Sequence, residues 1–205
     1  MRREDLDTRE RILDAARQEF LEKGYKGAWL RDIAKKAGVT TGALYGYFKN
    51  KEELYGTLVS PAYHGIVDLY RELLTRFAAM PHAQQQASMA AYTADGMIRM
   101  ADFVYENHDA FKLLLSCSED TEYADLVEAL ARMDEQANRN FEQVSSQAGA
   151  PVSSLPPKLE HILTTGLFTM FFELILHDIP REESEAYIRS MIRFFTCGYA
   201  GIMGF

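Results

Sequence analysis

The chain has 205 residues and a formal net charge of −8, with 47% hydrophobic and 25% charged residues. These values fit a globular protein with one domain, or with a small domain joined to a larger one, and they exclude disordered and collagen-like chains. The two cysteines, Cys117 and Cys197, form no disulfide framework or zinc motif, and the first residues lack the apolar segment of a signal peptide. The longest apolar stretch, 167–176, contains Glu173 and is too short to cross a bilayer. We therefore expect a cytoplasmic protein that makes no membrane contact.

Charge is distributed unevenly along the chain. Residues 1–55 contain twelve Lys and Arg and ten Asp and Glu, whereas residues 56–205 contain ten and twenty. Because affinity for phosphate depends on local cations, such a chain can carry a small nucleic-acid-binding domain on an acidic body. A chance excess of cations at the start of a solvated acidic protein explains the same numbers. Charge alone leaves both interpretations open.

Helical periodicity extends over almost the whole sequence. The first helix is predicted to begin at Asp7 or Thr8 and to end at Gly24, and the later ones to cover 30–37, 41–48, 51–77, 84–107, 110–117, 121–147, 158–177 and 182–203. Asn50 and Glu53 resemble a capping box at the start of the fourth helix, which Pro61 is expected to kink. No strand-like alternation of useful length is present. The sequence predicts an all-α fold with about nine helices.

Two of the short predicted helices, separated by 38–40, have the spacing of a helix-turn-helix. Ala34 and Ala43 are small enough for a close crossing, and Val39 is an apolar plug between the helices. Small and hydroxyl-bearing residues at the start of the second helix suit the major groove, and the residues that follow suit phosphates: Thr40, Thr41, Gly42, Tyr45, Tyr47, Lys49 and Lys51. The alternative is a three-helix core that simply buries these aromatic residues. It accounts for Leu44 and Phe48, but not for Tyr47 and the two lysines.

Residues 8–55 resemble the DNA-binding domain of the TetR family of one-component transcriptional regulators. The matching residues are Arg11-Ile-Leu-Asp-Ala-Ala16, Phe20, Glu22-Lys-Gly-Tyr25, Asp32-Ile-Ala34, Ala37-Gly-Val-Thr40 and Gly42-Ala-Leu-Tyr-Gly-Tyr-Phe-Lys-Asn-Lys-Glu-Glu-Leu54. Where family members usually have Thr-Ser or Thr-Thr, this chain has Ala28-Trp29, so that one helix cap is missing. Trp29 either contacts the DNA backbone in its place or packs on the first helix. With Trp29 and Arg31 added, the predicted DNA contacts are Trp29, Arg31, Thr40, Thr41, Gly42, Tyr45, Tyr47, Lys49 and Lys51.

The resemblance implies a DNA-binding domain at 1–50 and a helical effector-binding and dimerisation domain at 51–205. A TetR-like protein is a homodimer that binds a palindromic double-stranded DNA operator and represses transcription until a small molecule enters the second domain. In the operator-bound dimer, the two recognition helices occupy successive major grooves, about 34–36 Å apart. The helix at 51–77 would be the lever between the domains, with Pro61 and Gly65 as points of flexure.

The predicted dimer surface lies on the last two helices, which can form a four-helix bundle with a second copy. Its residues are Leu163, Leu167, Met170, Phe171, Leu174, Ile188, Met191, Phe195 and Tyr199. The predicted ligand pocket consists of Met97, Met100, Phe103, Phe111, Met133, His161, Phe168 and Phe172, although aromatic and methionine residues at this spacing are also typical of an ordinary core. The net charge favours a neutral or cationic effector over an anion.

Motifs of enzymes are missing from the sequence. It contains no G-x-S-x-G, no Gly-rich phosphate loop and no paired Glu-x-x-His motif. Glu173 and His177 have a spacing that can share a metal, but the remaining ligands are lacking. We therefore expect no enzyme, cofactor or metal site. The alternative is a helical small-molecule-binding protein or an enzyme with a vestigial helix-turn-helix.

Overall fold

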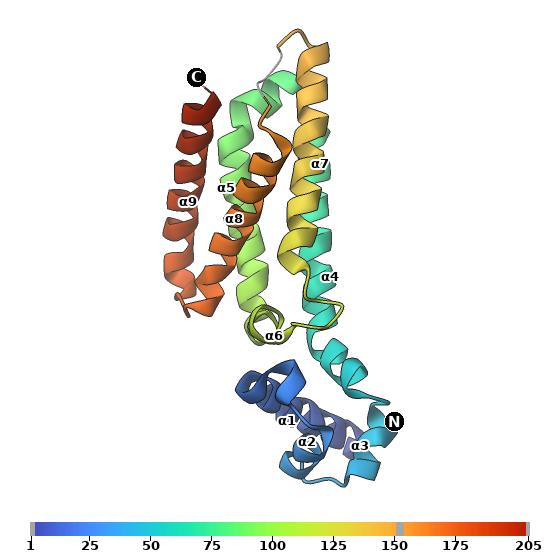
Figure 1. The fold of residues 1–205 in the computed structure, drawn as a ribbon. Coiled ribbons are helices and arrows are strands. Elements are labelled where there is room, and N and C mark those ends of the chain that lie inside the picture. Colours follow the sequence, from blue (N-terminus) through green and yellow to red (C-terminus); the bar gives the residue numbers. More distant parts are fainter. Residues whose placement is uncertain (1–2, 151–153, 204–205) are drawn as a thin grey trace. The chain divides into compact units, whose positions relative to one another are not determined.

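The computed structural model describes residues 3–150 and 154–203, and within them the chain consists of helices joined by turns (Figure 1). The helices are α1 (Arg3–Gly27), α2 (Leu30–Lys36), α3 (Thr41–Tyr47), α4 (Lys51–Ala78), α5 (His82–Glu106), α6 (His108–Cys117), α7 (Leu126–Gln147), α8 (Pro157–Leu176) and α9 (Arg181–Met203). The predicted all-α fold is confirmed. The predicted loop at 149–157 lies partly outside the described residues.

Two predicted helix starts are wrong by four or five residues: α1 begins at Arg3 rather than at Asp7 or Thr8, and α7 begins at Leu126 rather than at 121. A turn occupies the preceding residues, where Asp120 adopts a left-handed φ of 66°. The Thr121 hydroxyl donates to the carbonyl of Ser118 at 2.6 Å and accepts from the amide of Tyr123 at 3.2 Å. Such side-chain to backbone bonds compete with the helix, and here they delay its start.

The chain forms two compact units. One contains Met1–His64 and Asn107–Ala124, and the other contains Gly65–Glu106 and Asp125–Phe205. The first unit thus includes α6 in addition to the segment predicted to bind DNA. Helix α4 begins in the first unit and ends in the second.

The first unit is built around α1. Gly24 breaks this helix with a left-handed φ of 69°, as the sequence predicts, because a residue without Cβ adopts this conformation readily. The side chains of Ile12, Phe20, Ile33 and Leu44 are fully buried and join α1, α2 and α3 in one core. Helix α6 packs on α1, where the Cys117 thiol lies 3.2 Å from the carbonyl oxygen of Phe20.

The second unit is a helical bundle in which α5 packs on α9 and α7 packs on α8 (Figure 1). Three phenylalanines of α8, Phe168, Phe171 and Phe172, are at most 2% exposed. Helix α8, which contains the apolar stretch at 167–176, is long and apolar enough to cross a membrane. One helix of this kind is weak evidence of a membrane span, since core helices of globular proteins share these properties.

Candidate functional site

Helix α3 exposes almost its whole surface. Of its seven residues only Leu44 is buried, and Tyr45 is 52% exposed. The Thr40 hydroxyl caps the helix by accepting from the amide of Ala43 at 3.1 Å. Of the two alanines predicted to allow a close helix crossing, Ala34 of α2 is buried, whereas Ala43 is exposed, so the close crossing predicted for it is not formed. Val39, between the two helices, is half-buried. A helix anchored by one apolar residue presents its other side chains to the surroundings.

Two neighbouring contacts fix the elements around α3. Nη1 of Arg11 donates to the carbonyl of Ala37 at 3.3 Å, which holds the end of α2 against α1. The start of α4 has a close variant of the predicted capping box: Asn50 Oδ1 accepts from the Glu53 amide at 2.8 Å, and Glu53 Oε2 accepts from the amide of Lys49, one residue before the cap, at 2.7 Å. These contacts give the helix-turn-helix a defined geometry.

Lys51, which is predicted to contact a phosphate, lies against the end of α1. Its ammonium donates to the carbonyls of Tyr25 at 2.8 Å and Ala28 at 3.3 Å, and it lies 4.5 Å from the centre of the Tyr25 ring. Burial lowers its pKa. The ammonium of Lys51 therefore donates to carbonyls of its own unit, at and just after the end of α1.

The other residues predicted to contact DNA are accessible. Trp29 is 61% exposed, with the Arg31 guanidinium 6.0 Å from its ring centre, so the alternative in which Trp29 packs on α1 does not describe its position. Tyr47 is half-buried, while the remaining positions on and beside α3 are exposed: Thr40, Thr41, Gly42, Tyr45 and Lys49. The exposed set contains hydroxyl groups, cations and one indole, which are donors suited to phosphate oxygens and base edges.

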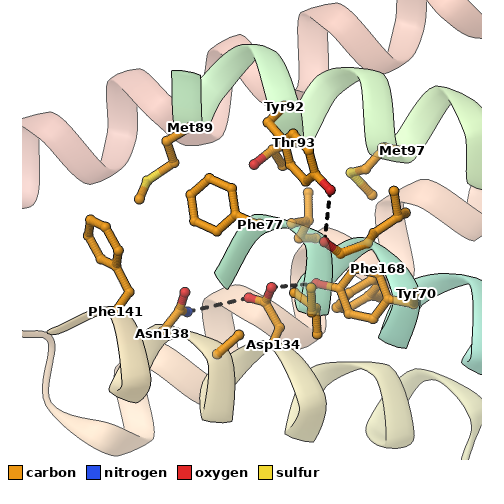
Figure 2. A pocket seen from close by; sticks show the side chains of 15 residues that line it. Tyr70, Phe77, Met89, Tyr92, Thr93, Met97, Asp134, Asn138, Phe141 and Phe168 are labelled. Carbon is orange, nitrogen blue, oxygen red and sulfur yellow. Dashed lines mark hydrogen bonds between the residues drawn. The ribbon is translucent and has the colours of Figure 1, made fainter. Parts of the chain in front are cut away.

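A cavity of about 110 Å³ lies in the second unit among α4, α5, α7 and α8 (Figure 2). Its wall is mostly aromatic and aliphatic, and the rings of Tyr70, Phe77 and Phe168 are labelled in Figure 2. The lining residues are Tyr70, Leu73, Leu74, Phe77, Met89, Tyr92, Thr93, Gly96, Met97, Asp134, Ala137, Asn138, Phe141, Leu167 and Phe168.

Asp134 is the one ionisable carboxyl group in the wall of this cavity. Its Oδ1 accepts a short hydrogen bond from the Tyr70 hydroxyl, and its Oδ2 accepts from Asn138 Nδ2 at 3.4 Å (Figure 2). Burial is the main reason that the pKa of Asp134 is raised. Tyr92 donates to the carbonyl of Leu73 at 2.9 Å, which fixes its ring. The cavity therefore combines an oriented aromatic wall with one carboxylate held by uncharged donors.

Of the residues predicted for a ligand pocket, the cavity contains Met97 and Phe168. Met133 lines a groove between α4 and α7 that adjoins the cavity and shares Leu74, Phe77, Ala137 and Phe141 with it. Met100 and Phe172 are packed in the core, and the Phe103 ring abuts Gly65. Phe111 belongs to the first unit, because α6 packs on α1. His161 instead pairs with carboxylates, with Nδ1 2.9 Å from Glu135 and Nε2 3.4 Å from Glu128, and the Glu135 hydrogen bond raises its pKa.

The sequence analysis missed several lining residues, namely Tyr70, Phe77, Asp134, Asn138 and Phe141. A signal was present for Asp134, which follows Leu130 by four positions and precedes Phe141 by seven. These positions share one helical face. An acidic residue on an otherwise apolar stripe marks a polar group that faces the interior.

The face predicted for dimerisation divides into two groups of residues. Phe171, Leu174 and Ile188 are at most 5% exposed within the subunit, so they belong to its own core, and Leu167 lines the cavity. Leu163, Met191, Phe195 and Tyr199 are half-buried. The same two helices expose other large apolar residues, which are Ile162 at 64%, Met170 at 39%, Leu176 at 38%, Tyr187 at 46%, Phe194 at 67% and Ile202 at 54%.

Oε2 of Glu173 lies 3.0 Å from Nε2 of His177, one turn further along at the C-terminal end of α8. In the described part of the chain, no group of three His, Cys, Asp or Glu residues has the arrangement of a metal site.

Comparison with known proteins adds a family likeness for the first unit. Residues 12–58 match the family described as "Bacterial regulatory proteins, tetR family". The HTH-type transcriptional regulator AcrR of Shigella flexneri is 36% identical over 80 residues, which are 39% of this chain and 37% of that protein. The HTH-type transcriptional repressor BepR of Brucella suis biovar 1 is 45% identical over 59 residues, 29% of this chain and 28% of that protein. The chain thus matches less than two fifths of the length of these relatives.

A likeness over most of the chain comes from solved structures. The TetR family transcriptional regulator PfmR of Thermus thermophilus has a TM-score of 0.60 and 21% sequence identity, covering 91% of this chain and 94% of that one. At this identity the likeness concerns the fold, and it extends through the helices of the second unit.

Proposed function

We propose that this chain, whose residues 12–58 match the tetR family, is a TetR-type transcriptional repressor of the cytoplasm that a small molecule releases from its operator. The observation that carries the proposal is the exposure of α3. Leu44 is its single buried residue, and Thr40 caps its free N-terminal end. A helix held in this way is suited to enter the major groove with its N-terminal residues against base edges.

The proposed DNA contacts fall into two classes. Thr41 and Gly42 lie at the start of α3 and would read the bases. Trp29, Arg31, Thr40, Tyr45, Tyr47 and Lys49 would contact phosphates and fix the register. Lys51 is left out of this set, because its ammonium is bound by carbonyls of the first unit.

We assign dimerisation to the exposed apolar side chains of α8 and α9. Ile162, Met170, Phe194 and Ile202 are each more than a third exposed. Large apolar side chains gathered on two adjacent helices favour burial against an identical pair in a second copy. Replacing Phe194 with glutamate is expected to yield monomers in sedimentation analysis, whereas an unchanged dimer would exclude this face.

Operator release is assigned to the cavity of the second unit, because α4 supplies Tyr70 and Phe77 to its wall and Leu54 and Tyr55 to the core of the first unit. A ligand that prefers one position of α4 changes the population of DNA-binding states. Pro61→Ala is expected to alter the response to the inducer more than the affinity for the operator. Equal inducer sensitivity of both proteins in a reporter assay would exclude a role for Pro61.

Gel-shift titration with a duplex from the region upstream of the gene tests the proposal directly. The repressor is expected to bind with an affinity that falls steeply as salt increases. A combined Tyr45→Ala and Lys49→Ala variant is expected to weaken binding to every sequence, while Thr41→Ala changes the preferred operator. A protein that folds and binds no duplex at any salt concentration would instead be the helical ligand-binding protein or enzyme with a vestigial helix-turn-helix.

A further inference from the structure

We propose that the ligand of the second unit is a lipophilic cation, with its aromatic or alkyl part in the cavity and its positive charge beside Asp134. This inference names the chemical class of the effector and therefore rests on the proposed function. It is carried by the shape of the cavity, by the position of its carboxylate and by the charges around its mouth.

The cavity opens beside a larger groove of about 420 Å³ in the same unit. Cavity and groove share six lining residues, which are Met89, Thr93, Asp134, Asn138, Phe141 and Leu167. The cavity alone, at about 110 Å³, has room for a group of the size of one aromatic ring. A longer ligand would extend into the groove, and the shared position of Asp134 places its carboxylate where the two spaces meet.

The charges along this path are all negative. Glu142 and Glu160 line the groove with Asp134, and none of the residues that line the cavity or the groove is a lysine or an arginine. Asn138 Nδ2 lies 3.4 Å from Asp134 and 3.3 Å from Glu160, so that one uncharged amide serves two carboxylates. Among the nearby cations, Arg139 is half exposed and lies 3.9 Å from Glu135. Arg71 and Arg132 line the other groove that adjoins the cavity, which Glu142 and Glu160 do not line.

Carboxylates in an apolar site are costly unless a positive charge compensates them. Burial and the neighbouring carboxylates raise the pKa of Asp134, and burial and Glu160 raise that of Glu142. A bound cation would remove this cost, whereas an anion would add to it. A neutral ligand would leave it unchanged.

The aromatic side chains in the wall of the cavity also favour a cationic ligand. The rings of Phe77 and Tyr92 have centroids 5.2 Å apart, and Tyr70 meets Phe168 edge to face at 5.3 Å. Such faces attract cations as well as apolar groups. Figure 2 shows these rings on the walls that enclose the labelled Asp134. Cation–π contacts and the carboxylate therefore favour one class of ligand.

Isothermal titration calorimetry on the purified full chain without DNA tests this inference. The probe is 3-phenylpropyl-trimethylammonium, compared with its neutral isostere in which carbon replaces nitrogen and with the anion 4-phenylbutanoate. The cation is expected to bind about tenfold or more tightly than the isostere, and the anion least tightly. Equal affinities for the cation and the isostere, or no binding of the cation, would overturn the proposal.

Two charge-matched variants distinguish an effect of the Asp134 carboxylate on cation binding from an effect of the protein's net charge. Asp134→Asn keeps an oxygen for the Tyr70 hydroxyl, and it is expected to weaken the cation about tenfold while leaving the isostere unchanged. Asp68→Asn removes the same charge from an exposed position on α4 and is expected to have no effect. Glu160→Gln is the second test, should Asp134→Asn fail to fold. Cation affinity that falls equally in the Asp68 variant would contradict a site at Asp134.

Gel shifts with the operator, carried out separately, distinguish failure of this inference from failure of the proposed function. A protein that binds the operator but not the cation retains its proposed role as a repressor, and only the ligand class is overturned. A protein that binds the cation but no duplex keeps the ligand site and loses the proposed role.

Discussion

Replacing Glu19 with glutamine tests whether a buried carboxylate holds α2 in place. The Glu19 side chain is fully buried, and its oxygens lie 2.5 Å from Nζ of Lys23 and 2.8 Å from Nζ of Lys36. Because Lys36 belongs to α2, this carboxylate joins α2 to α1 behind the proposed recognition helix. Burial tends to raise the pKa of Glu19, but the two lysines outweigh it and the pKa is lowered.

The expected loss follows from the exposure of the partners. Removing one partner from a fully buried ion pair costs about 3–5 kcal/mol. Here the lysines are 43% and 33% exposed, so water can solvate them after the substitution, and glutamine keeps one acceptor oxygen. We expect Glu19→Gln to lower the free energy of unfolding by about 2 kcal/mol. In a chain of this size this corresponds to a Tm lower by about 4–8 °C.

Glu22→Gln is the matched control, because Glu22 binds the same Lys36 at 2.7 Å but is 60% exposed. Surface pairs of this kind contribute at most about 1 kcal/mol. Urea unfolding followed by circular dichroism and by the fluorescence of Trp29, the single tryptophan, measures both variants. A Glu19 variant no less stable than the Glu22 variant would refute the reasoning.

The pH dependence supplies a second measurement on Glu19. Its pKa in the folded protein lies below its usual value of 4.5. The stabilisation is therefore fully present above that usual value, and it is lost as the pH falls through the lowered value of the folded state. The stability difference between wild type and Glu19→Gln is expected to shrink on acidification. A difference that grows in acid would contradict this assignment.

Three further predictions concern packing and phosphate contact. Gly65→Ala would bring a Cβ into the Phe103 ring, so we expect a loss of about 1–3 kcal/mol in thermal unfolding, and an unchanged Tm would contradict this. Burial raises the pKa of the Cys117 thiol, and peptide mass spectrometry after iodoacetamide treatment is expected to show slow modification in the folded protein and complete modification in urea. Lys51→Met is expected to leave the salt slope of operator binding unchanged, whereas loss of a phosphate contact reduces it by about 1.

Local sequence signals predicted the helices and their ends. Gly24 breaks α1, Thr40 caps α3, and Asn50 and Glu53 cap α4. Each of these features depends on residues within four positions of one another. The turn before α7 was missed because Thr121 bonds to the backbone around it, and the same residue type also occurs at helix starts.

Contacts between residues far apart in the sequence could not be predicted from local patterns. Lys51 lies 26 positions from the Tyr25 carbonyl that it binds, and Tyr70 lies 64 positions from Asp134. A periodic pattern shows which face of a helix is apolar, but it does not show which helix covers that face. For this reason Met97 and Met133 looked equivalent in sequence, although Met97 lines the cavity and Met133 lines only the adjoining groove between α4 and α7.

In the proposed function, helix α4 is the element through which a ligand in one unit would affect the other, because it contributes residues to both. Tyr55, near its start, donates from its hydroxyl to the Leu113 carbonyl in the first unit, and Tyr70 donates to Asp134 in the cavity of the second. Fifteen residues separate these tyrosines, a length of about 22 Å along a helix. In the proposed mechanism, a cation beside Asp134 changes the electrostatic surroundings of the hydrogen bond that Tyr70 donates to this carboxylate. We propose that binding acts in this way on the residue by which α4 contacts the cavity, and that α4, which also contains Tyr55, transmits the change.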